Sequence, residues 1–386
     1  MADIYLAHVS SGLGPARRVV VKEILPSLCR DERFASMLIQ EAKLVSQLRH
    51  ANVVQVLDLG REQDRLFIAM EYVEGFDLNQ LLRRLSKRRI ALPMGFAVFV
   101  VRETLAALDY AHRAKADTEE SLGVVHRDVS PSNVLVSFEG EVKLCDFGIA
   151  KALSAPLVEG GDRPSAGDAT GERSKIAGKA AYMSPEHALG QDLDLRADLF
   201  SAGILLWELC AGRRLYKGSE ERMLELAREG AVPPLPQRGL PNQRALQELL
   251  DKALAFEPAS RFSSAAAMLR ALDAYAAEAK LFTSQIRFGA FLSEHFEEEV
   301  TRVRRARERA ARALELGPPL EIRPIAEPSQ SVVPPEEEAP ETADAAAEEP
   351  AREATPSLLA GRAKTFVVLL AFALVALASV LLLSRG

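Results

Sequence analysis

VHRDVSPSNVLVSFEGEVKLCDFGIA, residues 125–150, is the stretch that decides the fold. Three of its residues can take part in chemistry: Asp128 lies in a polar segment, Asn133 follows it, and Asp146 directly precedes a Phe-Gly pair. Carboxylate and amide oxygens are hard ligands, and Mg²⁺ in proteins takes few such ligands beside phosphate oxygens. If folding brings Asn133 next to Asp146, the two side chains can hold Mg²⁺, and Asp128 then faces a substrate hydroxyl group.

A predicted β-hairpin brings these side chains together. The apolar segments Val134–Val136 and Val142–Leu144 flank Phe138-Glu139-Gly140, whose composition is typical of a hairpin turn. The two strands of a hairpin run antiparallel, so the residue before the first strand and the residue after the second lie at one end. The hairpin therefore places Asn133 beside Asp146.

Composition narrows the class of protein. The 386 residues are 48% hydrophobic and 26% charged, which supports one large or two ordinary domains with a substantial core. The net charge of −6 gives no indication of nucleic-acid binding. The three cysteines are isolated from one another, which argues against a disulfide framework and fits a reducing compartment.

These motifs resemble those of the protein kinases. Residues 126–133 match the pattern H-R-D-x-x-x-x-N, and Asp146 opens D-F-G at the spacing of a kinase catalytic loop and metal-binding turn. The resemblance covers about residues 1–280 and looks closest to bacterial Ser/Thr kinases of the eukaryotic type. It implies an α+β, bilobal protein-kinase fold, with a small β-rich lobe (1–72) over a mainly helical lobe (73–280) and ATP in the cleft.

The resemblance also assigns roles to single residues. Val19–Lys22 resembles the strand V-A-I-K, whose lysine holds the α- and β-phosphates, and Glu41 takes the place of the helix glutamate that pairs with it. The catalytic residues are then Asp128, Lys22 and Asn133, and the metal ligands are Asn133 and Asp146. The positions expected to bind the ATP cofactor are Lys22, Glu41, Val20, Met70, Glu71, Val73, Leu135 and Asp146.

Two further kinase features are expected in the helical lobe. The segment Tyr182–Glu186, YMSPE, resembles the close of the kinase activation segment, and the family pairs this glutamate with an arginine that corresponds to Arg261. Asp198, in a D-x-x-S-x-G pattern, is expected to cap the backbone of the catalytic loop.

Two departures from the kinase pattern concern phosphate binding. Ala2 falls where the third glycine of the glycine-rich loop would be, and the first strand and earlier glycines are missing, so we expect a longer native chain or a damaged nucleotide lid. Ser130 replaces the lysine that neutralises the γ-phosphate, and Lys179 stands where the family usually carries threonine. We therefore expect Lys179 to act as a catalytic residue that supplies the missing positive charge.

The last hundred residues predict a membrane attachment. Residues 281–317 are charged and helical in pattern, which favours a solvated helix or short coiled coil, and residues 318–361 are rich in Pro, Glu and Ala, which predicts a disordered acidic linker. Residues 365–383 form an apolar stretch long enough for a transmembrane helix. Arg362 and Lys364 precede this stretch and favour a single pass through the inner (cytoplasmic) membrane with the kinase domain in the cytoplasm.

The expected function is ATP-dependent and Mg²⁺-dependent phosphorylation of Ser or Thr hydroxyls on protein substrates, in signalling from the membrane. The Ser/Thr acceptor rests on the resemblance, because the chemistry of the motifs also allows tyrosine. The expected partners are protein substrates and the lipid bilayer, with no nucleic acid and with self-association left open. The alternative is a membrane-tethered pseudokinase that acts as a binding scaffold, favoured by Ser130 and the missing glycines.

Overall fold

The computed structural model describes residues 2–9, 17–24, 32–62, 65–115, 121–147 and 180–316. Within these ranges, no helix combines the length and the apolar character that a bilayer crossing needs. The predicted linker and the predicted transmembrane helix over 365–383 lie outside the described residues.

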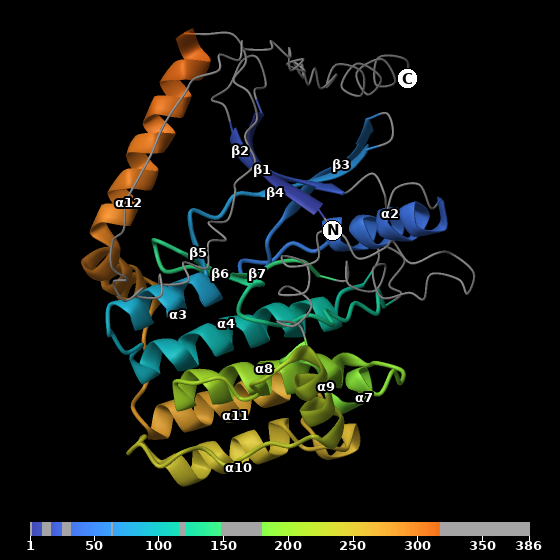
Figure 1. The fold of residues 1–386 in the computed structure, drawn as a ribbon, viewed down its shortest axis with the longest axis vertical. Helices are drawn as coiled ribbons and strands as arrows, with labels where there is room; N and C mark the ends of the chain where they lie inside the picture. Colours follow the sequence, from blue (N-terminus) through green and yellow to red (C-terminus); the bar gives the residue numbers. More distant parts are fainter. Residues whose placement is uncertain are drawn as a thin grey trace, which may run out of the picture. The chain divides into compact units, whose positions relative to one another are not determined.

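The N-terminal lobe is built on an antiparallel sheet of four strands, β1 (Ala2–Val9), β2 (Arg17–Ile24), β3 (Val56–Glu62) and β4 (Arg65–Glu71). The strand order is β1-β2-β4-β3, so β2, which carries Lys22, is paired on both sides. Strands β1 and β2 pair antiparallel, with Ile4 opposite Lys22 (Figure 1).

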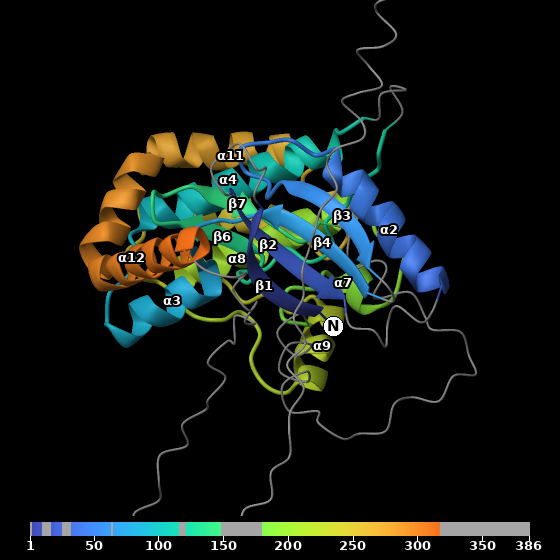
Figure 2. The same ribbon diagram turned by 90° about the horizontal axis from the view of Figure 1, so that it is seen from above.

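Helix α2 (Glu32–Ser46) lies beside this sheet (Figure 2). Its buried residues Ala35, Leu38, Ala42 and Val45 recur every three or four positions, which is the spacing of one helical face. Glu41 therefore lies on a helix, as the resemblance implies, and the apolar face of this helix forms part of the core.

A second, smaller sheet lies between the lobes and has the order β5-β6-β7. Its strands are β5 (Gly75–Asp77), β6 (Val134–Ser137) and β7 (Val142–Leu144). Strands β6 and β7 form the predicted hairpin, with Val134 opposite Leu144. Gly140 in the turn has φ +83°, a left-handed conformation that favours glycine.

The C-terminal lobe is helical and is arranged around α8 (Leu195–Ala211). Every residue from Ala197 to Ala211 is buried, as expected for a helix that is apolar on all sides. Figure 1 shows α8 between α4 and the helices that follow it. The other helices of this lobe are α3 (Leu78–Lys87), α4 (Met94–His112), α7 (Pro185–Ala188), α9 (Glu220–Glu229), α10 (Gln243–Ala253), the short 3₁₀ helix η1 (Pro258–Ser260) and α11 (Ala265–Glu278).

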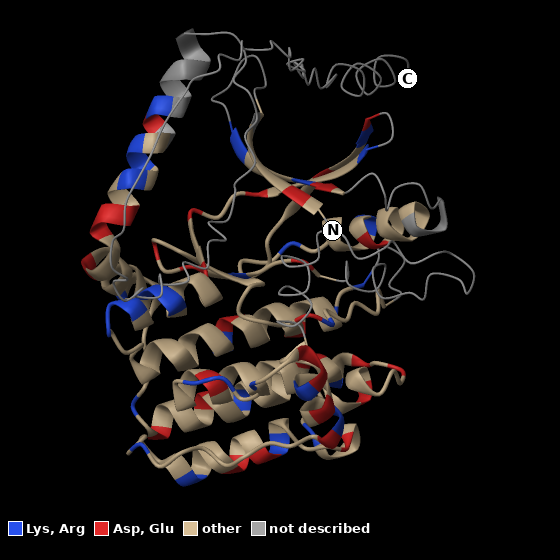
Figure 3. Ribbon diagram, viewed as in Figure 1, with Lys and Arg blue, Asp and Glu red and all other residues tan. Residues whose placement is uncertain are grey.

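A further helix, α12 (Gln285–Leu316), differs from the expectation of a solvated helix. Phe288, Leu292, Phe296 and Val300 are buried, and the compact unit that contains both lobes extends to residue 306. These four apolar residues stand at four-residue intervals among charged ones, so the composition of the segment hides its apolar face. The second half of the helix carries exposed arginines (Figure 3).

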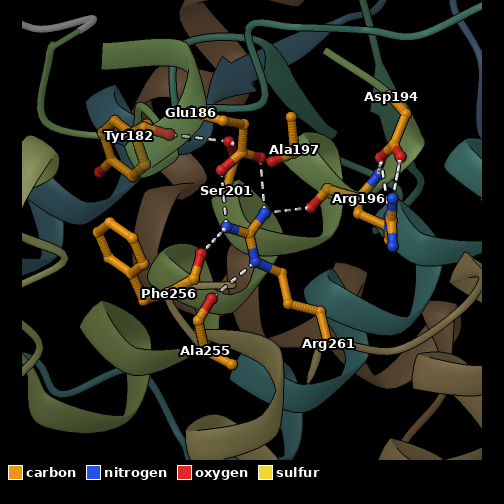
Figure 4. A network of polar contacts seen from close by, with 9 residues as sticks. All are labelled: Tyr182, Glu186, Asp194, Arg196, Ala197, Ser201, Ala255, Phe256 and Arg261. Atoms are coloured by element: carbon orange, nitrogen blue, oxygen red, sulfur yellow. Dashed lines mark hydrogen bonds and ion pairs between the residues drawn. The ribbon is translucent and has the colours of Figure 1, made fainter. Parts of the chain in front are cut away.

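The predicted ion pair between Glu186 and Arg261 is confirmed (Figure 4). Both side chains are buried, and the two guanidinium Nη atoms each lie 2.7 Å from a carboxylate oxygen of Glu186. The same guanidinium donates to the carbonyl oxygens of Arg196, Ala255 and Phe256. Burial by itself would raise the pKa of Glu186, but the hydrogen bonds from Arg261 outweigh it and the pKa is lowered. Glu186 is therefore ionised, and its ion pair with Arg261 holds the end of the activation segment to the helical lobe.

Removing one member of this pair should destabilise the protein strongly. We expect Arg261→Ala to lower the free energy of unfolding by about 3–5 kcal/mol, because a buried carboxylate is left unpaired. Urea unfolding followed by the fluorescence of buried Trp207, the only tryptophan, measures this.

The matched control is Arg244→Ala, because Arg244 forms an ion pair of 3.0 Å with Glu248 on α10 in which both side chains are exposed. Such an exposed pair contributes only about 0–1 kcal/mol. Equal losses in the two variants would contradict a special role of the buried pair.

Candidate active site

One buried carboxylate, that of Asp198, binds the backbone of the catalytic loop. Asp198 of α8 accepts hydrogen bonds from the backbone N–H of His126 at 2.8 Å and of Arg127 at 2.7 Å. A third contact joins the carboxylate of Asp198 to Nε2 of His112, at the end of α4, over 2.8 Å. Arg127 has φ +66°, so the backbone is bent sharply where Asp198 holds it. The predicted cap of the loop by Asp198 is confirmed.

The charge of Asp198 is maintained although the side chain is fully buried. Burial by itself would raise its pKa, but the hydrogen bonds from His112 and from the backbone of His126 outweigh burial and lower the pKa. A buried charge is tolerated when donors replace its water shell. The site therefore depends on three donors that converge on one carboxylate.

His126 connects the catalytic loop to the turn that carries Asp146. Its Nε2 lies 2.8 Å from the carbonyl oxygen of Cys145, and its Nδ1 accepts the N–H of Asp128 at 3.2 Å. A carbonyl only accepts, so the proton is on Nε2 and the ring is neutral. The ring also packs on Phe147, with 4.6 Å between centroids. His126 thus links the backbone at Asp128 to the backbone directly before Asp146.

Asn133 is fixed against Asp128. Its Nδ2 donates to the backbone oxygen of Asp128 at 2.7 Å and to Oδ2 of the same residue at 3.0 Å. The backbone oxygen of Asn133 accepts the N–H of Cys145 at 2.9 Å, next to Asp146. The hairpin therefore brings Asn133 and the Asp146 turn together, as the sequence predicted, and the amide oxygen of Asn133 would be its ligand atom for a metal.

Lys22 reaches this end of the hairpin from the N-terminal lobe. Its Nζ lies 2.9 Å from Oδ1 of Asp146, and both side chains are partly buried. Burial by itself would lower the pKa of Lys22, but the carboxylate of Asp146 outweighs it and the pKa is raised. Lys22 is thus a fixed positive charge. Glu41 lies on α2 and is partly buried, and its pairing with Lys22 stays a prediction.

The residues predicted to surround adenine lie on β2, β4 and β6 and directly after β4. Val20 of β2 is opposite Met70 of β4, and Met70 is buried. Leu135 of β6 is partly buried. The N–H of Glu71 donates to the carbonyl oxygen of Gln55 at 2.9 Å, and its carboxylate pairs with Lys143, so this N–H is engaged within the protein. Val73 follows, and its contact with adenine stays a prediction.

The structure describes Ser130 but not Lys179. Ser130 is buried, and its Oγ lies 2.9 Å from Oγ of Ser132. Lys179 lies outside the described residues, so its predicted role beside Ser130 stays a prediction.

Sequence reasoning missed two residues of the site. His112 and the bridging ring of His126 contact groups that are distant in the sequence, 86 and 19 residues away. The one available signal was His112 itself, a histidine at the end of a mainly apolar helix.

The donor set fits Mg²⁺ bound together with a nucleotide. Asn133 and Asp146 offer hard oxygen atoms, and Mg²⁺ with phosphate needs one or two such protein ligands. Lys22 adds an ammonium group that matches phosphate charge. The arrangement can hold a polyphosphate and its metal beside Asp128, the acceptor for a hydroxyl proton.

The chain is similar to known protein kinases. The family described as "Protein kinase domain" matches residues 8–272. "Tyrosine-protein kinase MasK" of Myxococcus xanthus is 35% identical over 301 residues, which are 78% of this chain and 45% of that protein. "Serine/threonine-protein kinase pkn3" of the same organism is 36% identical over 280 residues, 70% of this chain and 48% of that protein.

Another relative, "Serine/threonine-protein kinase PknL" of Mycobacterium tuberculosis, is 35% identical over 268 residues, 69% of this chain and 61% of that protein. The chain thus spans about half the length of the first two relatives. The crystal structure of the Mycobacterium tuberculosis PknI kinase domain is 27% identical with a TM-score of 0.51, and the match covers 71% of this chain and 91% of that one.

The lowered pKa of Asp198 predicts how stability depends on pH. Its pKa in the unfolded chain is about 3.9 and its folded pKa is lower, so its stabilising effect is present above about pH 4 and is lost as the pH falls. We expect Asp198→Asn to destabilise the protein at pH 7, and the gap to wild type to narrow below about pH 4 by up to ~1.4 kcal/mol per pH unit.

Urea unfolding of both proteins between pH 7 and pH 3, followed by the fluorescence of buried Trp207, measures this gap. Asp192→Asn, at an exposed position, is the control and should show no such narrowing. A gap that stays constant over the whole pH range would show that the charge of Asp198 is not what stabilises the loop.

Proposed function

Because the chain belongs to the protein kinase family, we propose that it transfers the γ-phosphoryl group of ATP to Ser or Thr hydroxyls of protein substrates. The observation that carries this proposal is the connected group of Lys22, Asp146, Asn133 and Asp128. Lys22 pairs with Asp146, the N–H of the neighbouring Cys145 binds the backbone oxygen of Asn133, and Asn133 binds Asp128.

Each of these residues has a task in phosphoryl transfer. Lys22 orients the phosphates through its ammonium group, and Asn133 and Asp146 would hold Mg²⁺. Bound Mg²⁺ neutralises charge on the phosphate oxygens. Asp128 accepts the proton of the attacking hydroxyl while the oxygen forms its bond to phosphorus and the bond to ADP breaks. Catalysis by the chain is then mainly positioning, which the contacts of Asp198 and His126 support.

The names of the relatives bear on which residue accepts the phosphoryl group. The relatives pkn3 and PknL are named Ser/Thr kinases, whereas MasK is named a tyrosine kinase. We propose Ser/Thr because the names of pkn3 and PknL agree with the motif resemblance. Phosphoamino-acid analysis of a labelled substrate separates the two.

We also propose that residues 365–383 anchor the chain in the inner membrane. The support is the uncharged apolar sequence and the preceding Arg362 and Lys364. The kinase domain would then lie on the cytoplasmic side, where ATP and protein substrates are present.

The catalytic role of Asp128 is tested with purified protein, labelled ATP, Mg²⁺ and a protein substrate. We expect Asp128→Asn to lower kcat by about 10²–10⁴-fold, because the amide cannot accept the proton. The KM for ATP should change little, and Asp192→Asn should behave like wild type. If Asp128→Asn and wild type incorporate label equally slowly, the chain is a binding scaffold and the proposed function is wrong.

The proposed cation from Lys179 is tested by a double-mutant cycle with Ser130. Loss of one positive charge beside the transferred phosphoryl group should reduce kcat by roughly 10²–10³-fold, so Lys179→Thr should be nearly inactive. Adding Ser130→Lys should restore much of the rate, because it returns the cation from the other side of the site. Full activity of Lys179→Thr at saturating ATP and substrate would remove this role.

A further inference from the structure

The docked half of α12 contacts the turn of the β6–β7 hairpin, whose other end carries Asn133 and the Asp146 turn. The contact is made backbone to backbone at two glycines. A Cβ on Gly289 of α12 would lie 2.8 Å from the backbone C and O atoms of Glu139. A Cβ on Gly140 would lie 2.1 Å from the backbone oxygen of Gln285 and 2.6 Å from the N atom of Gly289. No side chain fits between the helix and the turn at these points.

Aromatic packing holds α12 at this place. Phe288 is stacked on Phe96 of α4, with 4.8 Å between ring centroids, and is fully buried. Phe296, also fully buried, meets Phe76 of β5 at 5.3 Å. Phe76 in turn contacts Phe138 at the start of the hairpin turn, at 5.1 Å. The aromatic contacts therefore run from α12 through β5 to the hairpin turn.

Charged groups complete the docking surface. Glu299 of α12 is buried and pairs with Arg88 at 2.5 Å, and the guanidinium of Arg88 also lies over the ring of Phe296. Arg304 pairs with Glu139 in the hairpin turn at 2.7 Å, but both side chains are largely exposed. An exposed pair contributes little, so the anchor is the aromatic and glycine contact. Figure 1 shows the first half of α12 next to α3.

We propose that residues 285–306 of α12 are positioning residues for the metal site. They fix the hairpin turn, and the two short strands transmit this position to Asn133 and Asp146. Strand β6 begins at Val134, directly after Asn133, and β7 ends at Leu144, two residues before Asp146. A displaced turn therefore displaces both metal ligands together. This inference rests on one part of the proposed function, which is that the site binds Mg²⁺ together with ATP.

Two variants separate this role from mere stability. Gly289→Ala places a methyl group where the backbone of Glu139 lies, so helix and turn must move apart by more than half an ångström to reach ordinary contact. Alanine is the better helix former, so α12 itself is not weakened. Phe296→Ala instead removes the ring that holds α12 to Phe76.

The readout is the affinity for a non-hydrolysable ATP analogue, measured by titration calorimetry on the full chain in Mg²⁺ and in EDTA. We expect wild type to bind more tightly in Mg²⁺, and this gain to fall about tenfold in both variants, because shifts near 1 Å cost up to ~10²-fold in positioned sites. Affinity in EDTA should fall less than this, since Val20, Lys22 and Met70 lie on the N-terminal sheet and only Leu135 among the predicted adenine contacts lies on the hairpin.

Two controls complete the experiment. Met268→Ala in the core of α11 lowers thermal stability without touching the hairpin, and Ser293→Ala changes an exposed position of α12. Both variants should keep the full gain in affinity for the ATP analogue that Mg²⁺ gives in wild type. The proposal is overturned if Gly289→Ala and Phe296→Ala keep the wild-type gain, or if Met268→Ala loses it equally. Because binding needs no phosphoryl transfer, a chain without kinase activity that still shows the loss would contradict the proposed function and support this inference.

Discussion

The buried carboxylate of Asp198 is the interaction on which the site depends. A fully buried charge is unfavourable unless donors replace its lost water, and here two backbone N–H groups and His112 do so. These donors come from the catalytic loop and from α4, so satisfying one charge also sets the path of the loop. The sharp bend at Arg127, with φ +66°, persists because this contact holds it.

A few short contacts connect the catalytic loop to the predicted metal ligands. His126 links Asp128 to the carbonyl of Cys145, and Asn133 binds the backbone and the carboxylate of Asp128. Lys22 then pairs with Asp146 across the lobes. Lys22 comes from β2, Asp128 and Asn133 come from the catalytic loop, and Asp146 comes from the turn after β7, so packing between these segments positions the four groups. The docking of α12 on the hairpin turn extends this arrangement beyond the part of the chain that resembles a kinase.

Much of this arrangement could be predicted from local patterns. The hairpin with its glycine turn, the helix that carries Glu41, and the pairing of Glu186 with Arg261 followed from periodicity and motif resemblance, and the structure shows all three elements. The docking of α12 could not be predicted in the same way. Its apolar residues are diluted by charges, and a helix with such a composition gives no indication of which surface it meets.

The sequence by itself predicted the chemistry, because a lysine, two aspartates and an asparagine at kinase spacing indicate phosphate and magnesium binding. Only the tertiary structure decided which groups hold these residues in place. His112 meets Asp198 across 86 residues, and Gly289 meets Glu139 through backbone atoms that carry no sequence signal. Such contacts depend on how helices pack against one another, and packing is a property of surfaces that form only after distant segments have come together.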